Sequence, residues 1–157
     1  MARAGRNPLT ASNPKGRWDD GTFDVLYTAL APDAARAEVH YHLTRAQPVY
    51  LSSLKIHLHE LHADLQNVFV FESLEILAAF GIDPATYGTL EYARLQAEYS
   101  MTQQIGEAAH FLGVDGLVVP SARFPGQNLV VLVSAKLTHE KDHGPQDLKR
   151  WALENVK

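Results

Sequence analysis

The chain has 157 residues, with 18 Asp and Glu against 14 Lys and Arg and no cysteine. This length predicts one domain around one core. The lack of cysteine excludes disulfides, thiolate metal sites and a cysteine nucleophile, and the net charge of −4 argues against direct nucleic-acid binding. No apolar run reaches the roughly 20 residues of a membrane span and no signal-peptide pattern is present. We therefore expect a cytoplasmic protein without a membrane partner.

Hydrophobic periodicity and turn residues predict alternating strands and helices. Glycines at 81 and 113 stand where helix caps are expected. The expected elements in chain order are a strand at 23–29, a helix at 33–43, strands at 54–59 and 65–71, helices at 72–80 and 90–112, and strands at 116–120 and 128–135.

These elements predict an α/β fold of the mixed α+β kind, a single compact domain with a mixed sheet. Residues 1–16 are rich in Gly, Pro, Asn and Arg and predict an N-terminal arm. Residues 17–137 would form the folded domain. The polar residues 138–157 predict a peripheral helix or a tail.

The common nucleotide-binding loops, GxGxxG and GxxxxGK[ST], are absent. Several histidines could suggest a metal, since side chains two apart on a strand point the same way. They are His40, His42, His57, His59 and His62. Lys55 shares their face and no carboxylate or cysteine stands at ligand spacing, so we interpret them as a solvated polar face and expect no metal.

Two segments carry the candidate site. They are GRWDDGTFDVLYTALAPDAARAEVHYHL, which begins at residue 16, and GVDGLVVPSARFPGQNLVV, which begins at residue 113. Together and in this order they resemble the RES-domain family, whose name records an arginine, a glutamate and a serine. The match places those residues at Arg17, Glu38 and Ser121, with a tyrosine at Tyr27.

The sequence departs from the family pattern in two ways. Only sixteen residues precede Arg17, fewer than is usual in the family, and Asp19-Asp20-Gly21 replaces a common Asn-Pro-Pro-Gly. Both departures lie beside the expected entrance to the site.

The resemblance implies an ADP-ribosyltransferase-like fold, with 17–137 as the RES-like catalytic domain. It implies the toxin of a toxin–antitoxin pair that cleaves NAD⁺ at the nicotinamide–ribose bond. It also implies a helix-turn-helix antitoxin as partner and leaves a homodimer open. The acceptor of ADP-ribose is water or phosphate in some members and a protein side chain in at least one branch.

The residue chemistry agrees with NAD⁺ as the substrate. Nicotinamide leaves as a neutral molecule, so the site needs to stabilise an oxocarbenium-like sugar, for which one carboxylate can suffice. We assign that role to Glu38, whose charge acts strongly where water is excluded. Arg17 offers a fork for the diphosphate, and Tyr27 can stack on nicotinamide. Ser121 can contact substrate or hold Glu38, and Arg123 and Asn128 can assist.

The acceptor and the class of function stay open at this point. Arginine-directed ADP-ribosyltransferases commonly carry a carboxylate two residues before the catalytic glutamate, and here Arg36 stands there, which disfavours an arginine acceptor. NAD⁺ depletion through water or phosphate is preferred slightly over mono-ADP-ribosylation of a cellular protein. A non-catalytic nucleotide-binding module and a purely structural protein are the alternatives outside enzymes.

Overall fold

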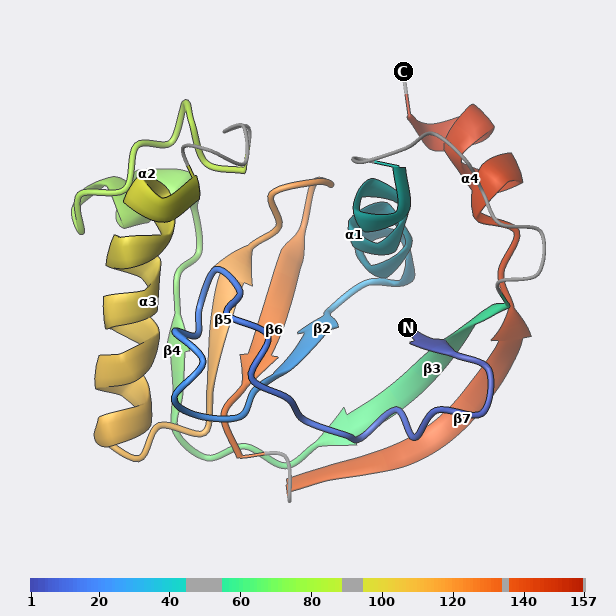
Figure 1. Ribbon diagram of the computed structural model, residues 1–157, viewed down its shortest axis with the longest axis horizontal. Helices are drawn as coiled ribbons and strands as arrows, with labels where there is room; N and C mark the ends of the chain where they lie inside the picture. The colour runs from blue at the N-terminus through green and yellow to red at the C-terminus, as the bar shows by residue number, and fades with distance from the viewer. Residues whose placement is uncertain (45–54, 89–94, 134–135, 157) are drawn as a thin grey trace.

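The computed structural model describes residues 1–44, 55–88, 95–133 and 136–156, and for residues 95–98 it describes the backbone alone. Seven strands and four helices make up this part of the chain (Figure 1). In chain order they are β1 (Ala2–Arg3), β2 (Leu26–Ala29), α1 (Pro32–Thr44), β3 (Ile56–Ala63), β4 (Val68–Val70), α2 (Leu74–Ala78), α3 (Leu95–Phe111), β5 (Gly116–Pro120), β6 (Gln127–Val131), β7 (Leu137–Pro145) and α4 (Leu148–Asn155).

The strands form two sheets with different roles. A four-stranded sheet has the order β2-β6-β5-β4, in which only β4 and β5 run parallel. A three-stranded sheet has the order β1-β3-β7 and is antiparallel. The first sheet lies between α3 and the β3–β7 pair (Figure 1), so both of its faces are covered.

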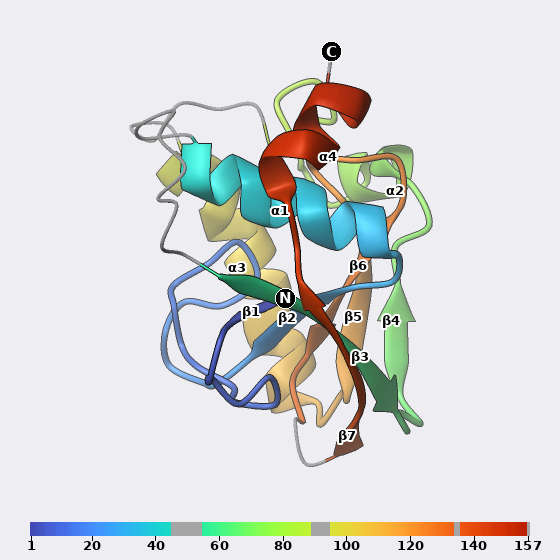
Figure 2. The ribbon, with the colours of Figure 1, turned by 90° about the vertical axis from the view of Figure 1, so that its right-hand side faces the viewer.

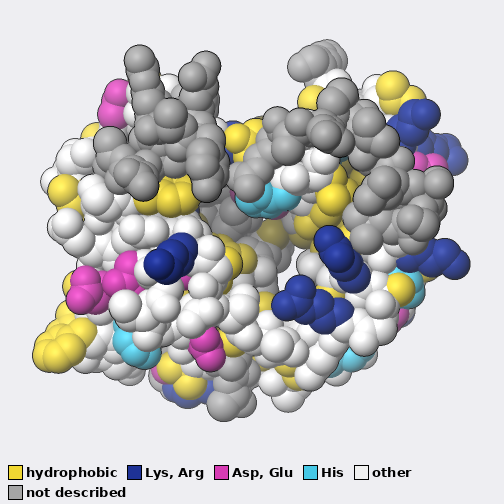
Figure 3. All heavy atoms as spheres, in the orientation of Figure 1, with side chains coloured by type: hydrophobic (Ala, Val, Ile, Leu, Met, Phe, Trp, Pro, Cys, Tyr) yellow, Lys and Arg dark blue, Asp and Glu magenta, His cyan; other side chains and the backbone are white. Residues whose placement is uncertain are grey.

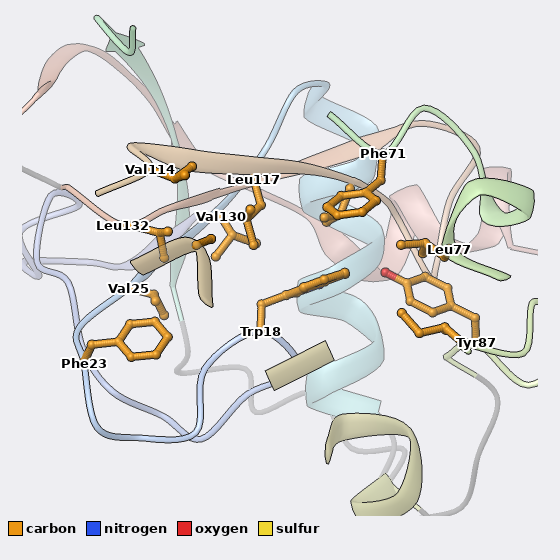
Figure 4. Close-up of a cluster of buried hydrophobic side chains, with 13 residues drawn as sticks. Trp18, Phe23, Val25, Phe71, Leu77, Tyr87, Val114, Leu117, Val130 and Leu132 are labelled. Atoms are coloured by element: carbon orange, nitrogen blue, oxygen red, sulfur yellow. The ribbon is translucent and has the colours of Figure 1, made fainter. Parts of the chain in front are cut away.

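Burial of both faces explains why β5 and β6 are continuous apolar runs in the sequence. Val118, Leu129 and Val131 contact one cluster, which Leu137 of β7 completes. The alternate residues of the two strands join the larger core (Figure 4). This core contains Trp18, Phe23, Val25, Phe71, Leu77, Ile82, Tyr87, Ala109, Val114, Leu117, Val119, Val130 and Leu132.

Most of the predicted elements are confirmed, some of them shorter than expected. Helix α1 extends the predicted helix by one residue at each end, β5 matches its prediction, and β6 ends at Val131. The predicted strands at 23–29 and 65–71 shrink to the short β2 and β4, and the predicted helix at 72–80 to α2. Gly81 and Gly113 have the positive φ angles of helix caps. Residues 54, 90–94 and 134–135 lie outside the described part.

One prediction about the chain ends needs correction. Residues 138–145 are neither helix nor tail, because they belong to β7, which pairs with β3 through two register irregularities. Helix α4 is the peripheral helix that was expected near the C-terminal end. In the expected arm, Ala2 and Arg3 pair with β3, and Ser12 pairs with Val25.

Helix α4 closes the domain on the side of α1, as Figure 2 shows. The indole Nε1 of Trp151 donates to Asp33 Oδ1 at 2.9 Å, and the Trp151 ring is buried. Asp147 accepts from the Arg150 backbone N–H at 3.0 Å and caps the helix. In the part of the chain that the structure describes, no helix is long and apolar enough to cross a membrane.

The buried Asp115 ties three segments together at the start of β5. Its carboxylate accepts from Lys136 Nζ at 2.8 Å and from the backbone N–H groups of Gln66 and Asn67 at 2.8 and 3.0 Å. The hydrogen bond from Lys136, followed by those two N–H groups, lowers the pKa of Asp115 to about 2. A pKa below the ordinary value means that this stabilisation is present above about pH 4 and is lost as the pH falls toward 2.

We therefore expect Asp115→Asn to unfold at lower urea concentration than the wild type at pH 6. The difference between the two midpoints should narrow steadily between pH 4 and pH 2, because protonation removes the same charge in the wild type. Urea unfolding curves over this pH range measure it. A constant difference down to pH 2 would contradict the role assigned to the Asp115 charge.

Candidate active site

A cavity of about 400 Å³ opens between α1, the loop before β2 and the face of the four-stranded sheet that carries Val119 and Val130. Its volume falls in the range of roughly 300–1,000 Å³ that is common for small-molecule sites. The space-filling view shows a hollow near the middle of this side of the molecule, with Lys or Arg side chains beside it (Figure 3). The polar and aromatic residues that line the cavity are Lys15, Arg17, Trp18, Tyr27, Glu38, Tyr41, His42, Tyr87, Tyr99, Arg123 and Asn128.

Glu38 is the one carboxylate among these lining residues, and it projects from α1. Its Oε1 accepts two hydrogen bonds, from Ser121 Oγ at 2.9 Å and from Asn128 Nδ2 at 2.8 Å. Ser121 follows β5 and Asn128 lies on β6, so two strands fix a carboxylate that a helix supplies. Within the described part of the chain, no group donates a hydrogen bond to Oε2.

Ser121 is placed behind Glu38 rather than in the cavity wall. Its hydroxyl donates to Glu38 and accepts from the Arg123 backbone N–H at 3.2 Å, and it is absent from the residues that line the cavity. Of the two roles expected for Ser121, this geometry supports the one that holds Glu38 in place.

Arg17 enters the cavity from the loop that precedes β2. Its guanidinium carbon lies 4.3 Å from the centre of the Tyr87 ring and 5.5 Å from that of Tyr99. The next residue, Trp18, is buried in the core, where it stacks on Phe71 (Figure 4). The buried indole therefore anchors the segment that carries the arginine.

A second cation, Arg123, also lines the cavity and lies against another tyrosine. Its guanidinium carbon is 3.3 Å from the centre of the Tyr41 ring, and its Nη1 donates to the Gly88 carbonyl. Burial is the main cause that lowers the pKa of Arg123, and the positive charge of Arg17 lowers it further. Two positive charges that repel each other in a partly buried cavity favour the binding of an anionic ligand.

Tyr27 lines the cavity, but its hydroxyl is hydrogen-bonded to other residues of the protein. It donates to Asp19 Oδ2 at 2.8 Å and accepts from the Trp18 backbone N–H at 2.9 Å. Burial and the charge of Asp19 raise the pKa of Tyr27 well above its ordinary value, so the hydroxyl stays protonated. The residue is partly exposed and lines the cavity, so its ring can still contact a ligand.

Several residues around the cavity were not predicted as site residues from the sequence, among them Asp19, Tyr41, Tyr87 and Tyr99. Tyr41 lies three residues after Glu38 on the same helix, a spacing that puts both on one face, so this signal was available. Tyr87 and Tyr99 belong to no recognisable motif, and Asp19 lies where the chain departs from the family pattern.

Arg36 does not face the cavity. Its guanidinium bonds Gln146 Oε1 at 3.0 and 3.1 Å and Asp33 Oδ1 at 2.7 Å. Residues two apart on a helix point to different sides, so the Arg36 side chain and Glu38 lie on different sides of α1. That an arginine acceptor is disfavoured stays a prediction.

The histidines on β3 form cross-strand pairs with β7. His57 Nδ1 lies 2.8 Å from Asp142 Oδ2, and His59 Nδ1 lies 3.2 Å from His139 Nε2. Within the described ranges no group of three His, Asp or Glu side chains is arranged to hold a metal ion.

A second hollow of about 480 Å³ lies between β2, the start of α1 and β3. Leu26, Leu58, Leu129 and Leu137 are among the apolar side chains that line it, and it has no Lys or Arg in its wall. The two arginines and Glu38 distinguish the first cavity as the candidate active site.

Comparison with known proteins identifies the family. The model of the RES domain matches residues 2–151, nearly the whole chain, so the chain belongs to the RES domain family, as its arginine, glutamate and serine motifs predicted. A solved structure that it resembles is the crystal structure of the M. tuberculosis MbcT–MbcA toxin–antitoxin complex. The TM-score is 0.74, with 23% identity over 98% of this chain and 84% of that chain. At this identity the likeness shows a common fold. The search of curated proteins gave no match.

Proposed function

We propose that the chain is the toxin of a toxin–antitoxin system and cleaves NAD⁺ at the nicotinamide–ribose bond. The observation that carries the proposal is the Glu38 carboxylate, which Ser121 and Asn128 fix through Oε1 inside a cavity that also holds two arginines. The second support is the family. The Glu38 carboxylate is suited to stabilise the positive charge that develops on the ribose during cleavage. The two arginines are suited to bind the negative phosphates of the dinucleotide.

Cleavage of the nicotinamide–ribose bond requires few other groups of the protein. The C–N bond between ribose and nicotinamide breaks, the electron pair leaves with the neutral base, and positive charge develops at the sugar. The Glu38 charge stabilises that cation, most strongly where water is excluded. A water or a phosphate then bonds to the anomeric carbon, and a water loses a proton to solvent.

The cations and the unpaired acceptor suggest how NAD⁺ lies. Arg17 and Arg123 are suited to the diphosphate, since guanidinium forks bind phosphate oxygens in pairs. Asn128 Oδ1 is buried and has no hydrogen-bond partner in the described part of the chain. Such an acceptor calls for a donor, which a ribose hydroxyl or the nicotinamide amide would supply. The Tyr27 ring is suited to stack on the base.

Incubation of the purified protein with NAD⁺ tests the proposal, with free nicotinamide as the readout. We expect stoichiometric release of nicotinamide and ADP-ribose in buffer, and of ADP-ribose 1″-phosphate when phosphate is the acceptor. Binding of NAD⁺ without release would instead favour a nucleotide-binding module. The absence of both would leave only a structural role and would overturn the proposal.

Ser121→Ala should lower kcat about tenfold with little change in KM, because a hydrogen bond to a charged group is worth about 1.5–3 kcal/mol and Asn128 still holds Oε1. Initial rates of nicotinamide release measure the effect. Thr28→Val is the matched control, since the Thr28 hydroxyl donates to Leu129 O at 2.8 Å away from the cavity and its loss should leave the rate unchanged. A Ser121→Ala enzyme with full kcat would remove Ser121 from the site.

The acceptor needs its own experiment. Mass spectrometry of the products, with and without cell extract, separates depletion of NAD⁺ from modification of a protein. A modified protein that forms in extract, while NAD⁺ stays intact with the toxin alone, would make mono-ADP-ribosylation the primary activity. We place depletion first because the cavity provides a reaction site for small acceptors without a docked partner.

The toxin role also implies an antitoxin, which we propose is a helix-turn-helix protein that covers the cavity. The resemblance to a chain of a toxin–antitoxin complex supports this partner. Co-expression should relieve toxicity and block nicotinamide release. A stable complex that still cleaves NAD⁺ at the full rate would contradict occlusion of Glu38.

A further inference from the structure

We infer that Asp19 is a positioning residue that fixes Arg17 in the cavity. This inference rests on the proposed function of the same site. Asp19 is completely buried and is not among the residues that line the cavity. It therefore acts through the residues that it holds.

The Asp19 carboxylate organises the turn that contains Arg17. Oδ1 accepts from the Lys15 backbone N–H at 2.8 Å, and Oδ2 accepts from the Gly16 N–H at 2.8 Å and from the Tyr27 hydroxyl at 2.8 Å. Both N–H groups precede Arg17 in the chain, so the carboxylate closes the turn around the arginine. A buried carboxylate is stable only with such a set of donors.

The turn is strained and tightly packed, which explains why it needs an anchor. Lys15 has a φ angle of +54°, the left-handed conformation that costs a non-glycine residue about 1–2 kcal/mol. A Cβ on Gly16 would lie 2.6 Å from the Tyr27 hydroxyl oxygen and 3.0 Å from Asp19 Oδ2. The backbone at Gly16 thus lies closer to the Tyr27 hydroxyl and the Asp19 carboxylate than any side chain would permit.

Helix α3 secures the same turn from the other side. The amide Nε2 of Gln103 donates to the carbonyls of Gly16 and Asp19 at 2.8 and 3.0 Å. Arg17 lies between these two residues in the chain. Its backbone is therefore held at both ends before any ligand binds, which lowers the cost of ordering the guanidinium on a phosphate.

The test measures KM and kcat for NAD⁺ in Asp19→Ala. We expect KM to rise roughly 10²-fold, the order of effect seen when a binding group is misplaced by about 1 Å, while kcat changes much less because Glu38 is untouched. Asp19→Asn keeps one carbonyl oxygen and should recover part of the loss. Asp20→Ala is the matched control, since the hydrogen bonds that Asp20 makes to described residues go to Thr22 in its own turn.

A double-mutant cycle separates positioning from general stability. In an Arg17→Ala background, Asp19→Ala should raise KM no further, because the group that Asp19 positions is gone. An equal rise in both backgrounds would overturn the inference, as would an unchanged KM in folded Asp19→Ala. If Asp19→Ala does not fold, Gln103→Ala must show the same KM effect in weaker form, and an unchanged KM there counts against the inference.

Two further measurements distinguish a failure of the inference about Asp19 from a failure of the proposed NAD⁺ cleavage. Calorimetry with ADP-ribose reports the diphosphate site without turnover. Amide hydrogen exchange needs no ligand. In Asp19→Ala the amides of Lys15 and Gly16 should lose their protection from exchange, while the amides of the four-stranded sheet should stay protected. A wild type that binds ADP-ribose but releases no nicotinamide would refute the activity alone. Retained protection at Lys15 and Gly16 would refute the anchor alone.

Discussion

Glu38→Gln is expected to lower the rate of nicotinamide release by about 10³-fold, the upper end of what removal of one electrostatic stabiliser costs, and to abolish toxicity. The substitution removes the charge and little else. A glutamine carbonyl can accept from Ser121 and Asn128, which now donate to Glu38 Oε1 at 2.9 and 2.8 Å. The cavity should therefore keep its shape, and KM should change little.

Initial rates and growth after induction measure this effect, and thermal unfolding confirms that the variant is folded. Glu107→Gln, on the exposed face of α3, is the matched control and should behave like the wild type. Turnover within threefold of the wild type in folded Glu38→Gln would rule out the electrostatic role and leave the carboxylate as a binding group.

Gly106→Ala is expected to destabilise the domain and to reduce NAD⁺ cleavage by roughly 10²-fold. A Cβ at Gly106 would lie 2.0 Å from the Trp18 carbonyl oxygen and 2.9 Å from its carbonyl carbon. Both atoms are backbone, so no rotamer change relieves the clash, and overpacking of this kind costs about 1–3 kcal/mol or more. The loop with Arg17 must then move away from α3.

This effect opposes the helix propensity of alanine, which exceeds that of glycine by about 1 kcal/mol. A lower midpoint of thermal unfolding in Gly106→Ala would therefore report the clash rather than the helix. Glu107→Ala, the next residue on α3, should show no loss in either assay. A Gly106→Ala protein that is as stable and as active as the wild type would show that the contact with Trp18 is looser than described.

Sequence patterns predicted the elements that bury apolar side chains and missed those that do not. Helix α1 and strands β5 and β6 have such patterns. Strand β7 lacks one, because only Leu137 among its nine residues is buried. Its pairing with β3 depends on backbone hydrogen bonds and cross-strand polar pairs, which leave no hydrophobic period in the sequence. The helix or tail predicted for residues 138–145 was wrong for this reason.

The residues of the site likewise divide into those that a sequence pattern predicted and those that none did. Arg17, Glu38 and Ser121 were predicted through the family motif. Arg17 and Glu38 line one cavity, and Ser121 lies behind Glu38 and donates to it. The tyrosines that line the cavity beside Arg17 were not predicted, because Tyr87 and Tyr99 lie in segments with no motif. A single tyrosine outside a motif suggests core packing. Asp19 was noted only as a departure from the family pattern. Its function as an acceptor for two consecutive backbone N–H groups is visible only once the turn is folded.

The two hydrogen bonds to Glu38 span 83 and 90 residues of the chain, and this distance has a consequence for synthesis on the ribosome. A nascent chain that has reached Thr44 already contains Arg17 and Glu38. It cannot orient the carboxylate until Ser121 and Asn128 have emerged and β6 has inserted between β2 and β5. Under the proposed function, the growing polypeptide therefore acquires its activity only late in translation, when β6 is in place.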